Sequence, residues 1–121
     1  MEITLIWYPK CSTCQKAAKW LEETGVTFSR RDIKEQNPSA EELERWWKQS
    51  GLPLKKFINT SGLLYKSMNL KEKLPAMQDA EILSLLGSDG MLVKRPILLC
   101  GEKAFPGFRE SEWEKLLRNA E

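Results

Sequence analysis

Two cysteines, Cys11 and Cys14, are the residues whose type and spacing could do chemistry. They lie in WYPKCSTCQKAAKWLEE, residues 7–23, between an apolar run and a helical pattern. A cysteine reacts as its thiolate, and the free N–H groups of a first helical turn can lower the thiol pKa to about 3.5–7.5. Lys10 and Lys16 would add positive charge. The spacing predicts that Cys11 attacks and that Cys14, one turn later and turned inward, resolves a mixed disulfide.

Two other interpretations of the pair remain open, a zinc site and two buried structural cysteines. A zinc site usually has four ligands, but the chain has three cysteines and no histidine. The pair lies at the start of a helix and not on its inward stripe, which argues against a purely structural role. The redox interpretation is therefore favoured, and no metal is predicted. The third cysteine, Cys100, ends the apolar run PILLC and is expected to be a buried core residue.

Composition limits the classes of function. The 121 residues are 41% hydrophobic and 30% charged, which is typical of one globular domain. The 19 basic and 17 acidic side chains give a net charge of +2, so direct nucleic-acid binding is not expected. No apolar run approaches the roughly 18 residues of a membrane span, and the first residues do not form a signal peptide. We expect a cytoplasmic protein without a membrane partner.

The elements that would position the cysteines form a strand–helix–strand unit. Residues 3–8 predict a buried strand, and a helix beginning near Cys11–Cys14 ends at Gly25, a residue that tolerates a left-handed conformation. Residues 26–33 alternate well enough to predict a second strand. A strand, helix and strand in this order favour a parallel, right-handed crossover.

The middle of the chain predicts a helical insert. A helix should begin at Ser39, which forms a capping box with Glu42, and end at Gly51. Trp46 and Trp47 are adjacent on it, so only one of them can face the core fully. Residues 52–86 predict several short helices. The residues that would separate these helices are Pro53, Ser61, Gly62 and Pro75.

The last third of the chain predicts a return to the sheet. Residues 96–100 form an apolar strand, and residues 103–108 form a weaker one, at an edge because Pro106 cannot donate to a ladder. Residues 110–120 predict an amphipathic helix. Together these elements predict a single α/β domain over residues 1–121. Its redox core would span about 1–35 and 91–121, and its helical insert about 38–88.

This arrangement resembles the arsenate reductase family of the glutaredoxin-coupled type and its Spx/MgsR-like relatives. The resemblance covers about residues 3–118, and its most specific blocks are YPKCSTC and VKRPI. It implies a thioredoxin-like (glutaredoxin-like) three-layer fold with an inserted helical subdomain. No bound cofactor is implied. Glutathione, glutaredoxin or thioredoxin would supply electrons.

The resemblance also implies roles for individual residues. Cys11 matches the nucleophile that attacks arsenate. Arg95 precedes Pro96, which is expected to have a cis peptide bond and to face the cysteines. Arg109 matches a second arginine that binds the oxyanion, and Asn59 occupies the position of a third.

Three departures from the reductase pattern favour an alternative. This chain has Asn59 in place of an arginine, Trp7 in place of a histidine, and Cys14 where a serine is common. A cysteine pair is typical of the Spx-like branch, in which it acts as a disulfide switch and the protein binds the C-terminal domain of the RNA polymerase alpha subunit. Gly51 falls at a glycine important for that contact, and it is equally a helix C-cap. A general disulfide reductase with protein clients is a third possibility.

Overall fold

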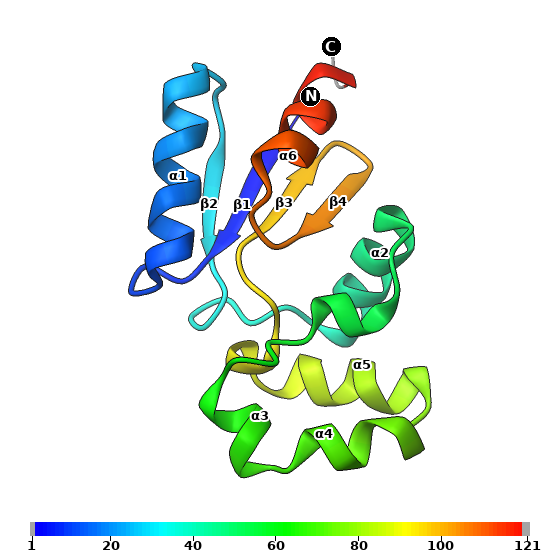
Figure 1. Ribbon diagram of the computed structural model, residues 1–121. Helices are drawn as coiled ribbons and strands as arrows, with labels where there is room; N and C mark the ends of the chain where they lie inside the picture. The colour runs from blue at the N-terminus through cyan, green and yellow to red at the C-terminus, as the bar shows by residue number, and fades with distance from the viewer. Residues whose placement is uncertain (1, 120–121) are drawn as a thin grey trace.

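A four-stranded sheet lies at the centre of the computed structural model, which describes residues 2–119 (Figure 1). Its order is β2-β1-β3-β4; β1 pairs with β2 in parallel, and the other two pairs are antiparallel. This mixed α/β topology is thioredoxin-like, as predicted. The strands are β1 (Ile3–Trp7), β2 (Ser29–Asp32), β3 (Ile97–Cys100) and β4 (Lys103–Pro106).

Helices cover both faces of the sheet and extend below it. α1 and α6 lie over one face, α2 packs against β4 on the other, and the remaining helices form a group beyond the end of the sheet (Figure 1). The longer helices are α1 (Ser12–Thr24), α2 (Ala40–Ser50), α5 (Asp79–Ser88) and α6 (Glu110–Asn119). The shorter ones are η1 (Leu54–Phe57), α3 (Leu63–Ser67), α4 (Leu70–Lys73), η2 (Leu74–Ala76) and η3 (Gly90–Leu92).

The alternation of side chains along the central strands divides the core in two. Leu5 and Leu98 pack under α1 and α6, whereas their neighbours Ile6 and Ile97 pack towards α2 and the insert. All four are fully buried, as expected for inner strands whose successive side chains point to opposite faces. The two clusters hold both helical layers onto one sheet.

Hydrogen bonds join the insert to the segment that precedes β3. Ile58 forms an isolated antiparallel bridge with Val93. The Lys94 N–H donates to the Phe57 carbonyl at 2.8 Å on one side of this bridge. Gly90 allows the insert to approach the sheet, because a Cβ there would lie 2.1 Å from the carbonyl oxygen of Ile33. The residues just before the predicted site loop are therefore rigidly held.

Most of the predicted local signals are confirmed. Gly25 and Gly51 end α1 and α2 with φ of 81° and 69°. The capping box of Ser39 and Glu42 is present in both directions. Trp46 is buried and Trp47 only half-buried, so only one of the two faces the core fully.

The strand predicted over residues 26–33 is wrong in its first half. β2 begins only at Ser29, which pairs with Thr4, so Phe28 would lie opposite Ile3, the first residue of β1. Residues 26–28 therefore have little ladder to join, although Val26 and Phe28 still pack against the core. The predicted last helical residue, Ala120, lies outside the described residues, and the proposed division into redox core and insert stays a prediction.

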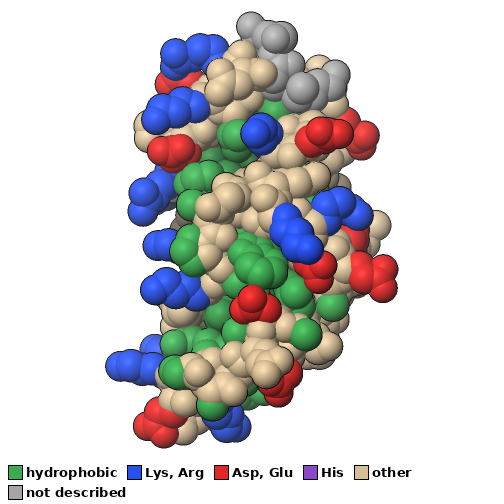
Figure 2. Space-filling model, turned by 90° about the vertical axis from the view of Figure 1, so that its right-hand side faces the viewer, with side chains coloured by type: hydrophobic (Ala, Val, Ile, Leu, Met, Phe, Trp, Pro, Cys, Tyr) green, Lys and Arg blue, Asp and Glu red, His purple; other side chains and the backbone are tan. Residues whose placement is uncertain are grey.

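The described residues also show whether a helix could span a membrane and how charge is distributed on one face. No helix within residues 2–119 is long and apolar enough to cross a membrane. Over the face that carries α2, Lys and Arg side chains are interspersed with Asp, Glu and hydrophobic side chains (Figure 2). That face therefore presents no extended surface of one charge.

A partly buried ion pair joins β2 to α2. Two nitrogens of Arg31 donate to the two carboxylate oxygens of Glu42 at 2.7 and 2.9 Å, with only 23% and 27% of the two side chains exposed. These bonds from Arg31 lower the pKa of the Glu42 carboxyl to about 2. Burial acts to raise this pKa, and the hydrogen bond from the Ser39 N–H acts to lower it. The stabilisation is present above the unfolded pKa of about 4.3 and is lost as pH falls through about 2.

We expect Glu42→Gln to lower the free energy of unfolding by about 1–2 kcal/mol at pH 7, because it removes the charge and keeps a side chain able to form the capping box. Urea unfolding between pH 7 and 2 measures the difference from the wild type, which should shrink as the pH falls below about 4.5. Glu44→Gln, in an exposed pair with Lys48, should change stability by less than about 0.5 kcal/mol. A difference that does not vary with pH would contradict this account.

Candidate active site

Cys11 lies at the N-cap of α1, immediately before the first helical residue. Its backbone is extended, with φ −91° and ψ 122°. Its N–H donates to the Tyr8 carbonyl at 2.9 Å and its carbonyl accepts from the Gln15 N–H at 3.0 Å, which closes the first helical turn. The side chain is half-buried, so Cys11 is held at the free N–H groups of the helix and still reaches solvent.

Cys14 lies one turn later and is completely buried. Burial raises the pKa of its thiol to about 12. The Tyr8 N–H, 3.5 Å from the sulfur, acts to lower this pKa, whereas a charge on Cys11 acts to raise it further. Cys14 is therefore a thiol at neutral pH, placed to donate a hydrogen bond to its neighbour.

Cys11 has the opposite protonation behaviour. Burial on its own would raise the pKa of its thiol, but several favourable contacts outweigh it and lower the pKa below its ordinary value. In order of size these are the backbone N–H of Cys14, the thiol of Cys14, the charge of Arg95 and the backbone N–H of Thr13. The sulfur that reaches solvent is thus the one that ionises first.

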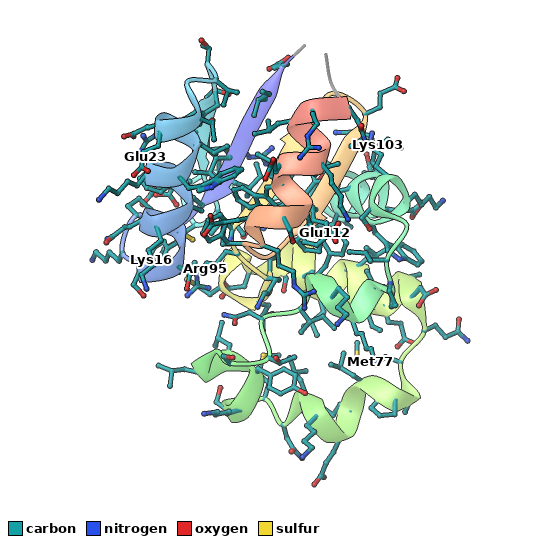
Figure 3. The ribbon with its side chains drawn as sticks, turned by 45° about the horizontal axis from the view of Figure 1, so that its top comes forward. Lys16, Glu23, Met77, Arg95, Lys103 and Glu112 are labelled. Carbon is teal, nitrogen blue, oxygen red and sulfur yellow. The ribbon has the colours of Figure 1, made fainter. Side chains whose placement is uncertain are left out.

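Arg95 lies on the loop that precedes β3, where its charge acts on both cysteines. The predicted cis bond between Arg95 and Pro96 is confirmed. The guanidinium lies over the Tyr8 ring, 5.2 Å from its centroid. Its Nε and Nη1 are buried and donate to no partner among the described residues. Figure 3 shows Arg95 near the first turn of α1, so these donors are available to an anion held beside Cys11.

A chain of hydrogen bonds positions the loop that carries Arg109. The buried Trp113 indole N–H donates to the Gly107 carbonyl at 2.9 Å. The Gly107 N–H in turn donates to the Pro96 carbonyl at 2.7 Å. Gly107 has φ 84°, a conformation that favours glycine. Arg109 follows with an exposed side chain just before α6, so the loop is fixed relative to Arg95 while the guanidinium remains free to move.

The structure does not bring Asn59 into this group. Its side-chain amide donates to the Met91 carbonyl at 3.2 Å and its backbone N–H to the Leu92 carbonyl at 2.8 Å. None of its hydrogen bonds in the described chain reaches Cys11 or Arg95. Asn59 therefore supports the junction between insert and core, and an anion at Cys11 would meet fewer fixed cations than a site with three arginines.

Gly51 and Trp7, the two remaining predicted positions, lie in different surroundings from each other. Gly51 is exposed at the end of α2, with nothing within 4 Å of the place where a Cβ would lie. Trp7, in the position where the resemblance implies a histidine, packs under the Arg30 guanidinium at 4.8 Å from its ring centroid. An indole cannot exchange a proton with a substrate at neutral pH, so proton transfer at this position is excluded.

The patterns in the sequence do not indicate Tyr8 and Trp113 as site residues. Tyr8 supports Arg95 with its ring and contacts Cys14 through its N–H, and Trp113 holds the Gly107 loop. An aromatic residue directly before the cysteine motif is the only available signal for Tyr8. Among residues 2–119, no group of three or more Cys, His, Asp or Glu side chains comes together to hold a metal ion.

We expect Cys11 to react with iodoacetamide at a lower pH than an ordinary thiol, while Cys14 stays unmodified until the pH nears 12. Alkylation rates followed by mass spectrometry between pH 5 and 10 give the midpoint for Cys11. Arg95→Gln removes a charge that favours the thiolate, so it should raise that midpoint and slow alkylation several-fold at pH 7. Arg118→Gln, an exposed change on α6, is the matched control. Equal midpoints in the two variants would show that Arg95 does not act on Cys11.

Comparison with known proteins assigns this site to a family. The ArsC family model matches residues 6–116. The uncharacterized protein YusI of Bacillus subtilis is 55% identical over 115 residues, which cover 95% of this chain and 98% of that protein. A crystal structure of a putative ArsC family related protein from Bacteroides fragilis has a TM-score of 0.92 and 48% identity, over 96% and 98% of the two chains. A possible arsenate reductase from Streptococcus mutans has a TM-score of 0.84 and 41% identity, over 93% and 97%.

More distant relatives include regulators. The regulatory protein MgsR of Bacillus subtilis is 29% identical over 95% of this chain and 90% of that protein. The global transcriptional regulator Spx of Staphylococcus aureus is 26% identical over 95% and 86%. These matches extend over the sheet, the cysteine pair and the insert together. This chain, with its Cys11–Cys14 pair, belongs to the ArsC family.

Proposed function

We propose that this protein is a cytosolic thiol–disulfide reductase, in which Cys11 attacks and Cys14 resolves. One observation carries the proposal: a half-exposed Cys11 lies at the N-cap of α1 with a fully buried Cys14 one turn later, and the pKa of the first thiol is lowered while that of the second is raised. A nucleophile needs to be ionised and accessible, and a resolving thiol needs to be close and unreactive until it is required.

In the first step, the Cys11 thiolate attacks one sulfur of a client disulfide. A Cys11–client disulfide forms, the client S–S bond breaks, and the other client sulfur leaves as a thiolate. The charge on Cys11 is then gone, so two of the influences that keep the Cys14 pKa high disappear with it. The Tyr8 N–H and Arg95, which favour the charged form of Cys14, remain. Cys14 therefore becomes easier to ionise at the moment when it must react.

In the second step, Cys14 gives its proton to the departing thiolate or to solvent and attacks the Cys11 sulfur. The client leaves with both sulfurs reduced, and its two electrons come from the pair, which closes as a Cys11–Cys14 disulfide. Glutathione, glutaredoxin or thioredoxin would return two electrons and reopen the pair. Neither step needs a histidine, which agrees with a site that has none.

Arsenate is the substrate class suggested by the family and by the name of the Streptococcus mutans relative. Arg95 offers two unpartnered donors, and Arg109 follows a loop bonded to Pro96. The position of a third arginine is occupied by Asn59, whose side-chain amide donates to the Met91 carbonyl. An incomplete set of cations weakens the binding of a small dianion, so disulfides are the better substrate for this arrangement.

A trapping experiment tests the order of the two cysteines. Glutathione disulfide should leave Cys14→Ser with one stable glutathione adduct on Cys11. It should leave Cys11→Ser unmodified, and it should convert the wild type to an internal disulfide without an adduct. Intact-protein mass spectrometry separates the three products. An adduct on Cys14 in the Cys11→Ser variant would reverse the proposed roles, and no reaction of the wild type would refute the proposal.

The substrate is tested by NADPH oxidation coupled to glutathione, glutaredoxin and glutathione reductase. We expect reduction of a small disulfide at a rate at least about 100-fold above that of Cys11→Ser, because the nucleophile is lost. Turnover with arsenate should be much lower, and Asn59→Arg is the variant that would raise it if cation number is limiting. Arsenate turnover in the wild type equal to that with disulfide would make this protein an arsenate reductase.

A redox-controlled regulator is the second candidate, and three observations favour it. Cys11 and Cys14 can form an internal switch, and the MgsR and Spx relatives are named as regulators. The exposed Gly51 leaves room for a partner at the end of α2. In this case the reduced and oxidised proteins should differ in binding to the C-terminal domain of the RNA polymerase alpha subunit. Equal, negligible retention of both forms in a pull-down would eliminate this candidate.

A further inference from the structure

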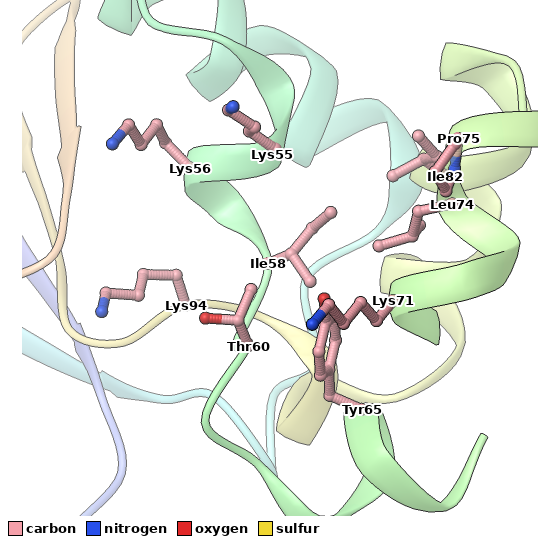
Figure 4. Close-up of a pocket in the computed structure, with 10 residues that line it drawn as sticks. All are labelled: Lys55, Lys56, Ile58, Thr60, Tyr65, Lys71, Leu74, Pro75, Ile82 and Lys94. Carbon is pink, nitrogen blue, oxygen red and sulfur yellow. The ribbon is translucent and has the colours of Figure 1, made fainter. Parts of the chain in front are cut away.

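Two adjoining hollows lie beside the candidate active site. The larger one, about 530 Å³, lies between η1, the short insert helices and Lys94 (Figure 4). The smaller one, about 240 Å³, lies between Lys56, Lys94 and the loop from Phe105 to Arg109. Since Lys56 and Lys94 line both, the two hollows form one elongated groove. We call it the lysine groove, and its cationic residues are Lys55, Lys56, Lys71, Lys94 and Arg109.

The lysine groove is lined by one sign of charge. Its five cations are all exposed, and neither hollow is lined by an aspartate or glutamate. None of the ion pairs formed within residues 2–119 uses any of the five. The net charge of the whole chain is only +2, and on the face shown in Figure 2 acidic side chains accompany the basic ones. The groove is therefore a local concentration of uncompensated positive charge, which attracts an anionic partner.

The floor of the groove is apolar. Ile58, Leu74 and Ile82 line the larger hollow, and Thr60 and Tyr65 add hydroxyl groups that can bond a peptide backbone. Figure 4 shows Ile58 in the middle, with Lys56 and Lys94 on one side and Lys71 on the other. The cations are thus spread along an apolar strip. This pattern suits an occupant in which anionic and apolar groups alternate.

One end of the groove borders the loop that is bonded to Pro96, next to Arg95 in the chain. Lys94 directly precedes Arg95, whose charge acts on Cys11. A Cβ at Gly107 would lie 3.2 Å from Cε of Lys94, so this side chain runs along the loop that is bonded to Pro96. A segment lying in the groove would therefore contact the loop that carries Arg109, close to the residues that flank Pro96.

We propose that the lysine groove binds an acidic, extended peptide segment of the client protein and so presents the client's disulfide to Cys11. The inference rests on the proposed reductase function for the identity of this client. A compact anion could occupy one hollow, but it would leave the cations of the other unpaired. An extended chain advances about 3.3–3.6 Å per residue, so a few residues reach along both hollows. Alternating carboxylates and apolar side chains match the rim and the floor.

Binding of a redox-inert peptide tests this inference separately from the chemistry of Cys11. The probe is a fluorescent octapeptide in which glutamate alternates with leucine or valine around a central serine in place of cysteine. Fluorescence anisotropy compares it with peptides that carry glutamine or lysine at the glutamate positions. The variants are Lys56→Gln, Lys71→Gln and the double change Lys56→Gln/Lys71→Gln. The matched control is Lys103→Gln, an exposed lysine at the far end of β3 from Arg95 (Figure 3).

Of the three peptides, we expect only the acidic one to bind. Each single variant should raise its Kd about three-fold and the double variant about ten-fold, because exposed charge contacts are worth about 0.2–1 kcal/mol each. Lys103→Gln should leave Kd unchanged, and salt of about 0.5 M should abolish binding. Equal binding of the three peptides, or equal Kd for Lys103→Gln and the groove variants, would overturn the inference. Competition by succinate as strong as by the peptide would assign the groove to small dicarboxylates instead. Peptide binding without trapping of Cys11 would refute the proposed reductase and leave the groove as a binding site.

Discussion

The stabilisation of one negative charge, on the sulfur of Cys11, is the interaction on which the rest of this structure depends. A half-buried thiolate loses solvation, and that loss must be offset by donors held in place before the charge appears. The start of α1 supplies two N–H groups, Cys14 supplies a thiol, and Arg95 supplies a full charge. Each comes from a segment that the sheet holds rigidly. Burying Cys14 has a double effect, because the same burial that keeps it protonated also turns its thiol towards Cys11 as a donor.

The rest of the core serves to bring two distant segments to that sulfur. β1 ends at Trp7 and delivers the chain to the cysteine loop, while β3, antiparallel to it, begins at the same end of the sheet with Ile97 opposite Ile6. Residues 91 positions apart in sequence, Ile6 and Ile97, thus meet because adjacent antiparallel strands place the end of one beside the start of the other. The hydrogen bond from Gly107 to Pro96 then adds the third segment. An error in the register of β3 would move Arg95 away from Cys11 and reverse the core faces together.

Signals that act within a few residues were readable from the sequence, because their causes are local. The capping box of Ser39 and the left-handed Gly25 depend on neighbours in the chain. The length of β2 was not readable, since it depends on where β1 begins to pair. The contact between Arg95 and the Tyr8 ring, and the bond from Trp113 to Gly107, join segments that only the folded sheet brings together. A family resemblance supplied Arg95 as a candidate, but no pattern supplied its partners.

The unpartnered Nε and Nη1 of Arg95 make the energy of the site depend on the charge of Cys11. Buried guanidinium nitrogens without a hydrogen-bond partner carry an energetic cost that an anion relieves, and the charge of Arg95 favours the thiolate form of Cys11. When Cys11 joins Cys14 in a disulfide, the thiolate charge is lost and Arg95 faces two neutral sulfurs. The loop from Arg95 to Pro96 is bonded to Gly107, and Arg109 follows two residues later. Oxidation therefore removes an attraction at one end of a connected set of loops that borders the lysine groove.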